Sequence, residues 1–136
     1  MTLAESLGEC LDEAGLSNEV VDMSDFSASE LGAESIVLVV TSTYGNGDPP
    51  YNARGLLEAL RKDDMPRLGN LKFAVFGLGD STYPNFCQCG RDFDKRLEEL
   101  GAHRIFDRCD CDGEPEELFE EWQDKIVSVL RDHCSD

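Results

Sequence analysis

The sequence is short of positive charge. Twelve lysines and arginines stand against 29 aspartates and glutamates, so the formal net charge at pH 7 is −17. A field of this sign repels nucleic acid and anionic membranes, and it favours protein partners with a basic face. A solvated surface that only keeps the protein soluble would have the same composition. The net charge alone therefore does not distinguish a docking face from such a surface.

Long hydrophobic runs are missing as well. The longest strongly apolar run, residues 36–40, is far too short to span a bilayer. The first twenty residues contain five acidic side chains, where a signal peptide would need an apolar stretch. We therefore expect no membrane association and a cytoplasmic location, in which the six cysteines stay reduced.

The cysteines lack the spacing of a metal site. Four of them form two Cys-x-Cys pairs, Cys87 with Cys89 and Cys109 with Cys111, whereas structural zinc sites use two to four intervening residues. The two histidines lie far apart and add no ligand pair. The pattern favours buried or idle thiols over a metal or redox site.

What the sequence does contain is an alternation of helical and extended segments within 136 residues, the size of one domain. Apolar residues recur at helical spacing in residues 2–14, 52–61, 84–100 and a last segment that begins near Pro115. Strands are expected at 19–23, 35–43, 71–79 and 103–109. The runs at 35–43 and 71–79 are mostly apolar, as in parallel strands covered on both faces. The alternation predicts an open, doubly wound α/β sheet.

Two loops follow these apolar strands, where such sheets bind ligands. They read TYGNGDPP (43–50) and GLGDSTYPNF (77–86), and each places a tyrosine close behind its strand, Tyr44 and Tyr83. Two rings on adjacent loops could sandwich a flat heteroaromatic ligand, each stacking contact contributing about 0.5–1.5 kcal/mol beyond area burial. Either loop alone is typical of an ordinary turn, but together they predict a ligand site.

The same segments resemble a known family. TSTYGNGDPPYNA (41–53) and FAVFGLGDSTYPNFCQCGRDFDKRLEELGA (73–102) are similar to the FMN-binding, flavodoxin-like domains of diflavin reductases, the group of the sulfite reductase flavoprotein and cytochrome P450 reductase. The resemblance implies one domain over residues 1–136, a sheet of strand order 2-1-3-4-5, and FMN held between Tyr44 and Tyr83. It implies further flavin contacts from Ser42, Thr43, Gly45, Asn46, Gly47, Leu78, Gly79, Asp80, Phe86 and Cys87.

The resemblance also implies a function. Such domains pass single electrons between a flavin reductase and a redox acceptor, without bond-making catalysis of their own. The implied partners have a basic face: an FAD/NADPH reductase module and a haem or iron–sulfur acceptor. Acidic residues near the flavin edge would dock them, namely Asp110, Asp112, Glu114 and Glu116. Whether the domain is a free electron-transfer flavoprotein or a component of an NADPH-dependent oxidoreductase stays open.

The sequence departs from this family at its start. The family opens with a buried central strand and a loop of the type S/T-x-T-G-x-A/T-E that cradles the FMN phosphate, whereas here Met1 stands inside the first helix. No other segment has phosphate-loop spacing, so we expect FMN affinity to be reduced. We expect a true start upstream of Met1; the alternatives are a strand from a partner or second copy, and a degenerate fold. Unpaired strand edges would invite self-association.

Two other functions compete with the electron carrier. A degenerate flavodoxin fold could serve as an acidic protein-interaction module without tight flavin binding. A phospho-accepting receiver domain shares the strand order but needs an aspartate at the end of the central apolar strand and a lysine after the last strand. This chain has Thr43 and Arg108 at those places, which disfavours a receiver.

Overall fold

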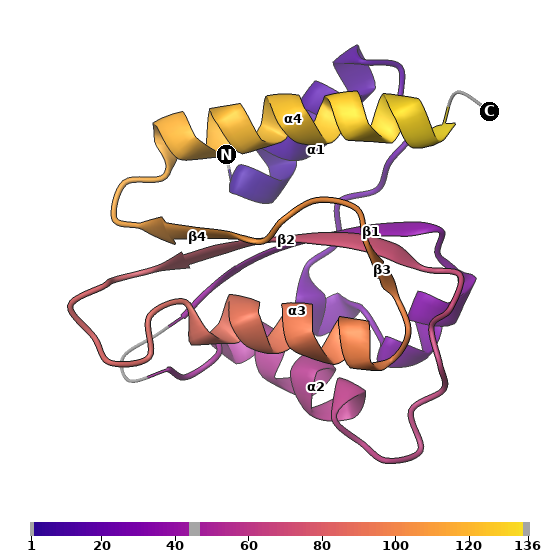
Figure 1. Ribbon diagram of the computed structural model, residues 1–136, viewed down its shortest axis with the longest axis vertical. Helices are drawn as coiled ribbons and strands as arrows, with labels where there is room; N and C mark the ends of the chain where they lie inside the picture. Colours follow the sequence, from indigo (N-terminus) through magenta and orange to yellow (C-terminus); the bar gives the residue numbers. More distant parts are fainter. Residues whose placement is uncertain (1, 44–46, 135–136) are drawn as a thin grey trace.

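The computed structural model describes residues 2–43 and 47–134, and it arranges them in three layers (Figure 1). A parallel sheet lies in the middle, with helices on both faces. On one face lie α1 (Leu3–Glu13) and α4 (Glu116–Cys134); on the other lie α2 (Tyr51–Leu60), α3 (Gln88–Glu99) and two 3₁₀ helices (Met23–Asp25 and Ala28–Ala33). This confirms the expected α/β architecture.

The sheet is built around one central strand. β2 (Lys72–Gly79) pairs in parallel with β1 (Ile36–Ser42) on one edge, and with β3 (His103–Arg104) and β4 (Cys109–Asp112) on the other. Between Phe73 and Phe76 β2 advances by three residues, while the neighbouring chain advances by five, from Arg104 to Cys109. Residues 105–108 therefore bulge, and the single strand expected at 103–109 is two short strands.

Two other sequence expectations are wrong. No strand forms at 19–23, where Val20 and Val21 are 46% and 39% exposed. β-branched residues extend readily, but a strand needs a neighbour, and no described segment pairs with this one. The helix expected from residue 84 begins only at Gln88, because Cys87 has the left-handed conformation (φ 54°) that a right-handed helix cannot include.

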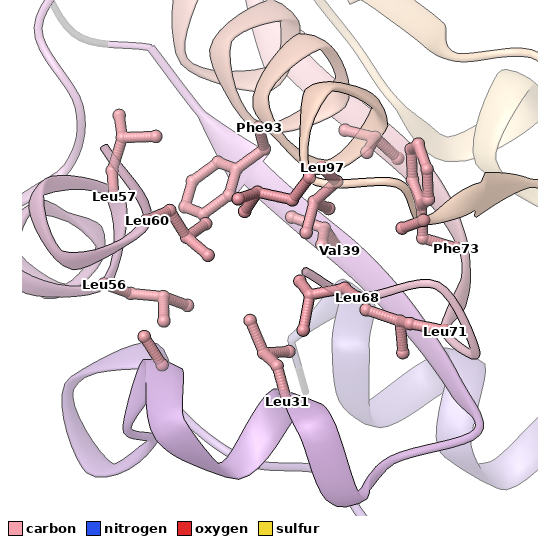
Figure 2. Packing of buried hydrophobic residues seen from close by; sticks show 14 of the residues in the cluster. Leu31, Val39, Leu56, Leu57, Leu60, Leu68, Leu71, Phe73, Phe93 and Leu97 are labelled. Atoms are coloured by element: carbon pink, nitrogen blue, oxygen red, sulfur yellow. The ribbon is translucent and has the colours of Figure 1, made fainter. Parts of the chain in front are cut away.

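Each face of the sheet carries its own hydrophobic cluster. On the α2/α3 side, leucines of α2 face Phe93 and Leu97 of α3 (Figure 2). On the α1/α4 side, Phe76 packs against Phe119 and Trp122, with ring centroids 4.9 and 5.3 Å apart. Trp122 is 2% exposed, which confirms that it is a core residue, as its place on the apolar face of the last helix predicts.

β1 has a paired neighbour on one edge only within the described part of the chain. The bonds from Lys72 N to Ser35 O and from Thr43 N to Leu78 O, both 2.9 Å, show that odd-numbered residues of this segment bond to β2. The backbone groups of Ile36, Leu38 and Val40 therefore point the other way, where no described residue pairs with them. An apolar, unpaired edge suits association with another strand. Self-association through it stays a prediction.

Candidate functional site

A pocket of about 190 Å³ lies at the carboxyl ends of β1 and β2. It is lined by Ser42, Thr43, Leu78, Gly79, Asp80, Tyr83, Asn85, Phe86 and Cys87. This is the edge at which a parallel sheet flanked by helices presents its ligand site. Eight of these nine residues belong to the set expected from the sequence, so the structure brings the two predicted loops together.

The remaining predicted residues belong to the first loop. Tyr44, Gly45 and Asn46 lie outside the described residues, so a sandwich of two tyrosines stays a prediction. Gly47 has φ 116°, and a Cβ added there would lie 2.8 Å from Cβ of Asn85, so the two loops touch at the rim. Asn85 is the lining residue that sequence reasoning missed, and its only signal is its position between Pro84 and Phe86.

Tyr83 sits on an ordered turn. Oδ1 of Asp80 accepts hydrogen bonds from Thr82 N at 2.9 Å and from Thr82 Oγ1 at 2.6 Å, and Tyr83 N donates to Asp80 O at 3.1 Å. An aspartate that bonds the backbone two residues on is a common way to shape a turn. Tyr83 is 47% exposed, which leaves surface of its ring free for a ligand. The Asp80 carboxylate is engaged in shaping the turn.

Thr43 joins β1 to the start of α3. The N-cap residue of α3, Cys87, makes no side-chain capping bond. Instead, Cys89 N donates to Thr43 Oγ1 at 2.9 Å, so a hydroxyl from another strand satisfies a free N–H of the first turn. The pocket wall at Thr43 is thereby tied to the helix below it, a long-range contact that local sequence patterns do not reveal.

The first turn of α3 approaches β2 closely. A Cβ on Gly79 would lie 2.9 Å from both N and Sγ of Cys87, and a Cβ on Gly90 would lie 3.2 Å from Cα of Gly77. Sequence reasoning assigned Gly79 to close approach of a ligand; the structure adds that it lets the helix end pack onto the strand. Gly79 and Cys87 both line the pocket, so this close packing sets part of its wall.

Cys87, which lines the pocket, and Cys109 on β4 are poor nucleophiles. Burial raises the pKa of the Cys87 thiol to about 12 and that of Cys109 to about 11. A thiol with such a pKa stays protonated at neutral pH, and the thiolate is the reactive form. The five cysteines whose side chains are described are free, and the described residues contain no cluster of three metal-ligating side chains.

The lining suits a flat ring better than a phosphate group. Leu78, Tyr83 and Phe86 supply apolar and aromatic surface, and Ser42 and Thr43 supply hydroxyls. None of the nine lining residues is a lysine or an arginine. The volume of about 190 Å³ is below the roughly 300–1,000 Å³ typical of small-molecule sites.

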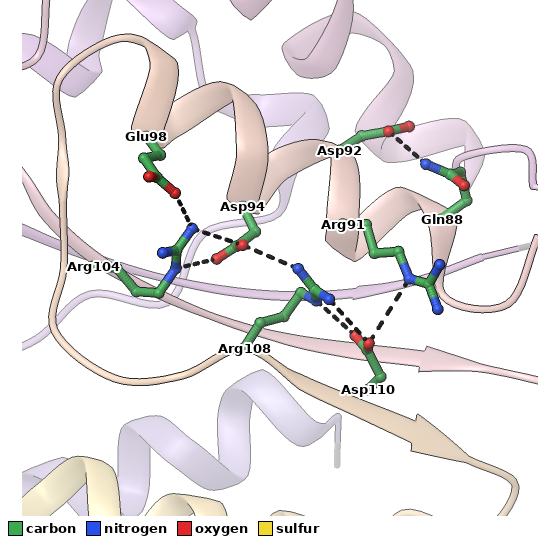
Figure 3. Close-up of polar contacts among 8 residues, drawn as sticks. All are labelled: Gln88, Arg91, Asp92, Asp94, Glu98, Arg104, Arg108 and Asp110. Atoms are coloured by element: carbon green, nitrogen blue, oxygen red, sulfur yellow. Dashed lines mark hydrogen bonds and ion pairs between the residues drawn. The ribbon is translucent and has the colours of Figure 1, made fainter.

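A network of charged side chains fixes the bulge and β4 against α3 (Figure 3). Asp94 on α3 is only 4% exposed, and it accepts two bonds from Arg104, at 2.8 and 2.9 Å, and one from Arg108 at 3.0 Å. Arg108 also donates to Asp110 on β4 at 2.9 Å. Sequence reasoning missed Asp94, although it falls on the same helical stripe as Phe93 and therefore at a buried position.

A parallel sheet covered by helices on both faces, with an aromatic-lined pocket at its carboxyl edge, defines the class of flavodoxin-like α/β domains. The flavodoxin family model matches residues 1–122. The chain belongs to the flavodoxin family. This confirms the resemblance and the fold class expected from the sequence, and it supports FMN as the cofactor.

Curated relatives and solved structures agree with this assignment. The chain is 40% identical over 134 residues to the sulfite reductase [NADPH] flavoprotein alpha-component of Neisseria meningitidis serogroup A, and 42% identical over 133 residues to that of Vibrio cholerae. Each match covers 98% of this chain and 22% of the relative, so the chain spans less than a quarter of those proteins.

Two flavodoxin structures superpose closely. The Streptococcus pneumonia TIGR4 flavodoxin has a TM-score of 0.83 at 27% identity, covering 96% of this chain and 88% of the other. A cysteine-to-serine mutant of Pseudomonas aeruginosa flavodoxin has a TM-score of 0.81 at 32% identity, covering 95% and 89%. Among the described helices of the present chain, none is long and apolar enough to cross a membrane.

Proposed function

We propose that this domain binds FMN and passes single electrons between a flavin reductase and a redox acceptor. The observation that carries the proposal is the pocket at the ends of β1 and β2, which gathers eight of the residues expected to contact flavin in a chain of the flavodoxin family. Bound FMN would supply the one-electron chemistry. The protein's own residues would hold the ring, order the loops around it and keep water from one face.

The described residues divide this task among themselves. Tyr83 offers a half-exposed ring for stacking, and Leu78 and Phe86 offer apolar wall. Gly79 and Asp80 line the pocket, and their backbone groups would bond polar atoms on the ring edge. The hydroxyl of Thr43 holds the wall to α3 through Cys89 N.

For the partners we propose a reductase module with FAD and NADPH on one side and a haem or iron–sulfur protein on the other, in the cytoplasm. The sulfite reductase [NADPH] names of the relatives support this choice. Not every acidic residue near β4 is available for docking, because Asp110 is paired with Arg108 and Asp112 is bonded to Ser81. Glu114, Glu116 and Glu117 are exposed and lie outside the ion pairs of the described chain. They are therefore the residues that we propose for partner docking.

Replacing Tyr83 with alanine tests the proposal at the pocket. Loss of stacking and of the buried ring area should weaken FMN binding by about 2 kcal/mol, roughly thirtyfold in the dissociation constant. The measurement is a flavin fluorescence titration of the purified protein. Tyr51→Ala is the matched control, because Tyr51 is 86% exposed and does not line the pocket. Equal FMN affinities for Tyr83→Ala and Tyr51→Ala would remove the pocket from the proposal.

The alternative expected from the sequence is an interaction module that uses its acidic surface and does not bind flavin tightly. That function predicts partner binding unchanged by added flavin and by Tyr83→Ala. The electron carrier predicts that electron transfer to an acceptor protein requires bound flavin and is weakened by Tyr83→Ala.

A further inference from the structure

We propose that Asp112 is a positioning residue for the turn that carries Tyr83. The inference rests on the proposed function, and it concerns a residue that sequence reasoning assigned to partner docking. Asp112 is the last residue of β4, and its carboxylate is bonded across the sheet edge to the loop that follows β2. It would act on a ligand through this turn.

The contacts between β4 and the turn are specific. Asp112 Oδ1 accepts from Ser81 N at 3.0 Å, and Asp112 Oδ2 accepts from Ser81 Oγ at 2.5 Å. Next to it, Gly113 N donates to Gly79 O at 3.2 Å, with Gly113 at φ 78°. Each carboxylate oxygen therefore has one donor, and the turn is held at residues 79 and 81.

These bonds are what anchor the turn. The bonds of Asp80 with Thr82 and with Tyr83 lie within the turn and set its shape, but they do not fix its place. In the described part of the chain, the side-chain bonds that tie residues 80–83 to another element are the two to Asp112. Both are exposed to solvent, so they add little to global stability. Holding the turn in place before a ligand arrives should instead favour binding, because less freedom is lost on association.

A purely electrostatic role and a positioning role of Asp112 predict opposite changes in FMN affinity when its side chain is removed. FMN is an anion, so deleting a nearby negative charge should tighten FMN binding if charge were all that mattered. Releasing the turn should weaken it. The Ser81 bonds lower the pKa of Asp112, so the anchor is intact at neutral pH and is lost only as the pH falls through that lowered pKa.

The test compares FMN and riboflavin titrations of the wild type, Asp112→Ala, Asp112→Asn and Asp107→Ala. We expect Asp112→Ala to raise both dissociation constants about five- to tenfold. Asp112→Asn, which keeps an acceptor for Ser81 N, should recover part of this loss. Asp107→Ala makes the same charge change on an exposed residue of the bulge that the described structure shows in no hydrogen bond or ion pair, and it should leave riboflavin unchanged and FMN unchanged or slightly tighter.

Two further readouts separate positioning from unfolding. The urea midpoint of Asp112→Ala should match that of the wild type, whereas the shape of its bound-flavin absorption band should change with the looser turn. In Ser81→Ala/Asp112→Ala the loss should not exceed that of Asp112→Ala alone. If Asp112→Ala binds FMN and riboflavin as tightly as the wild type or more tightly, this inference is overturned, but the proposed function is not. A wild type that binds no flavin would overturn the proposed function and this inference with it.

Discussion

Phe76→Ala is expected to lower the free energy of unfolding by about 3–5 kcal/mol. Phe76 has no exposed surface and stands in the middle of the central strand. Its ring meets Phe119 edge-on, with an interplanar angle of 89°, and lies beside Trp122 of the same helix. Alanine would remove these contacts and leave a cavity between β2 and α4 that close-packed neighbours fill only in part.

The loss is large against the total stability of about 5–15 kcal/mol that a domain of this kind has. Urea unfolding followed by the fluorescence of Trp122, the one tryptophan in the sequence, measures it. Phe76→Leu keeps most of the apolar volume and should cost about 1 kcal/mol. Tyr83→Ala, at the exposed rim, should stay within about 0.5 kcal/mol of the wild type. A urea midpoint of Phe76→Ala that equals that of the wild type would contradict the packing described for Phe76.

Asp94→Ala is expected to cost about 3 kcal/mol, although it changes a charged residue. Asp94 is the buried acceptor for Arg104 and Arg108, two cations that together hold the bulge and β4 against α3. Without it, both guanidinium groups stay partly buried with fewer acceptors. Arg104 keeps Glu98 and Arg108 keeps Asp110, which places the expected loss at the lower end of the range for a broken buried pair.

Asp92 on the same helix provides a matched control. It pairs with Arg61 at 2.9 Å, but the Arg61 side chain is 54% exposed, so this pair contributes at most about 1 kcal/mol. Urea unfolding of Asp92→Ala and Asp94→Ala at low and high salt separates the two. The Asp94 loss should persist at high salt, since buried pairs are screened less. Equal losses for the two substitutions would show that burial of Asp94 is not what matters.

The sequence predicts the fold where local pattern and tertiary environment agree. Residues 36–40 and 73–78 are apolar and lie in the two long paired strands, and the four helices lie where helical spacing places them, apart from the later start of α3 at Gln88. Prediction from the sequence fails where pairing with a distant segment determines the local structure. Val20 and Val21 have strand propensity but no neighbour, and the register of β3 and β4 depends on a bulge that only pairing with β2 reveals.

The candidate site shows the same division. Loop composition identifies Tyr83, Gly79 and Phe86 because turn glycines and aromatic rings stand out against a buried strand. The contacts that shape the pocket are long-range: Thr43 to Cys89 N, and Asp112 to Ser81. Residues more than thirty positions apart make them, and no local spacing predicts such pairs.

The central claim is that the pocket at the ends of β1 and β2 takes a flavin ring. Titrating flavin-free protein in parallel with FMN and riboflavin, while following flavin fluorescence and visible absorption, tests it most directly. Because no cation lines the described pocket, we predict that both flavins bind with quenched fluorescence and with dissociation constants within about threefold of each other. Protein that stays colourless and quenches neither flavin would contradict the account.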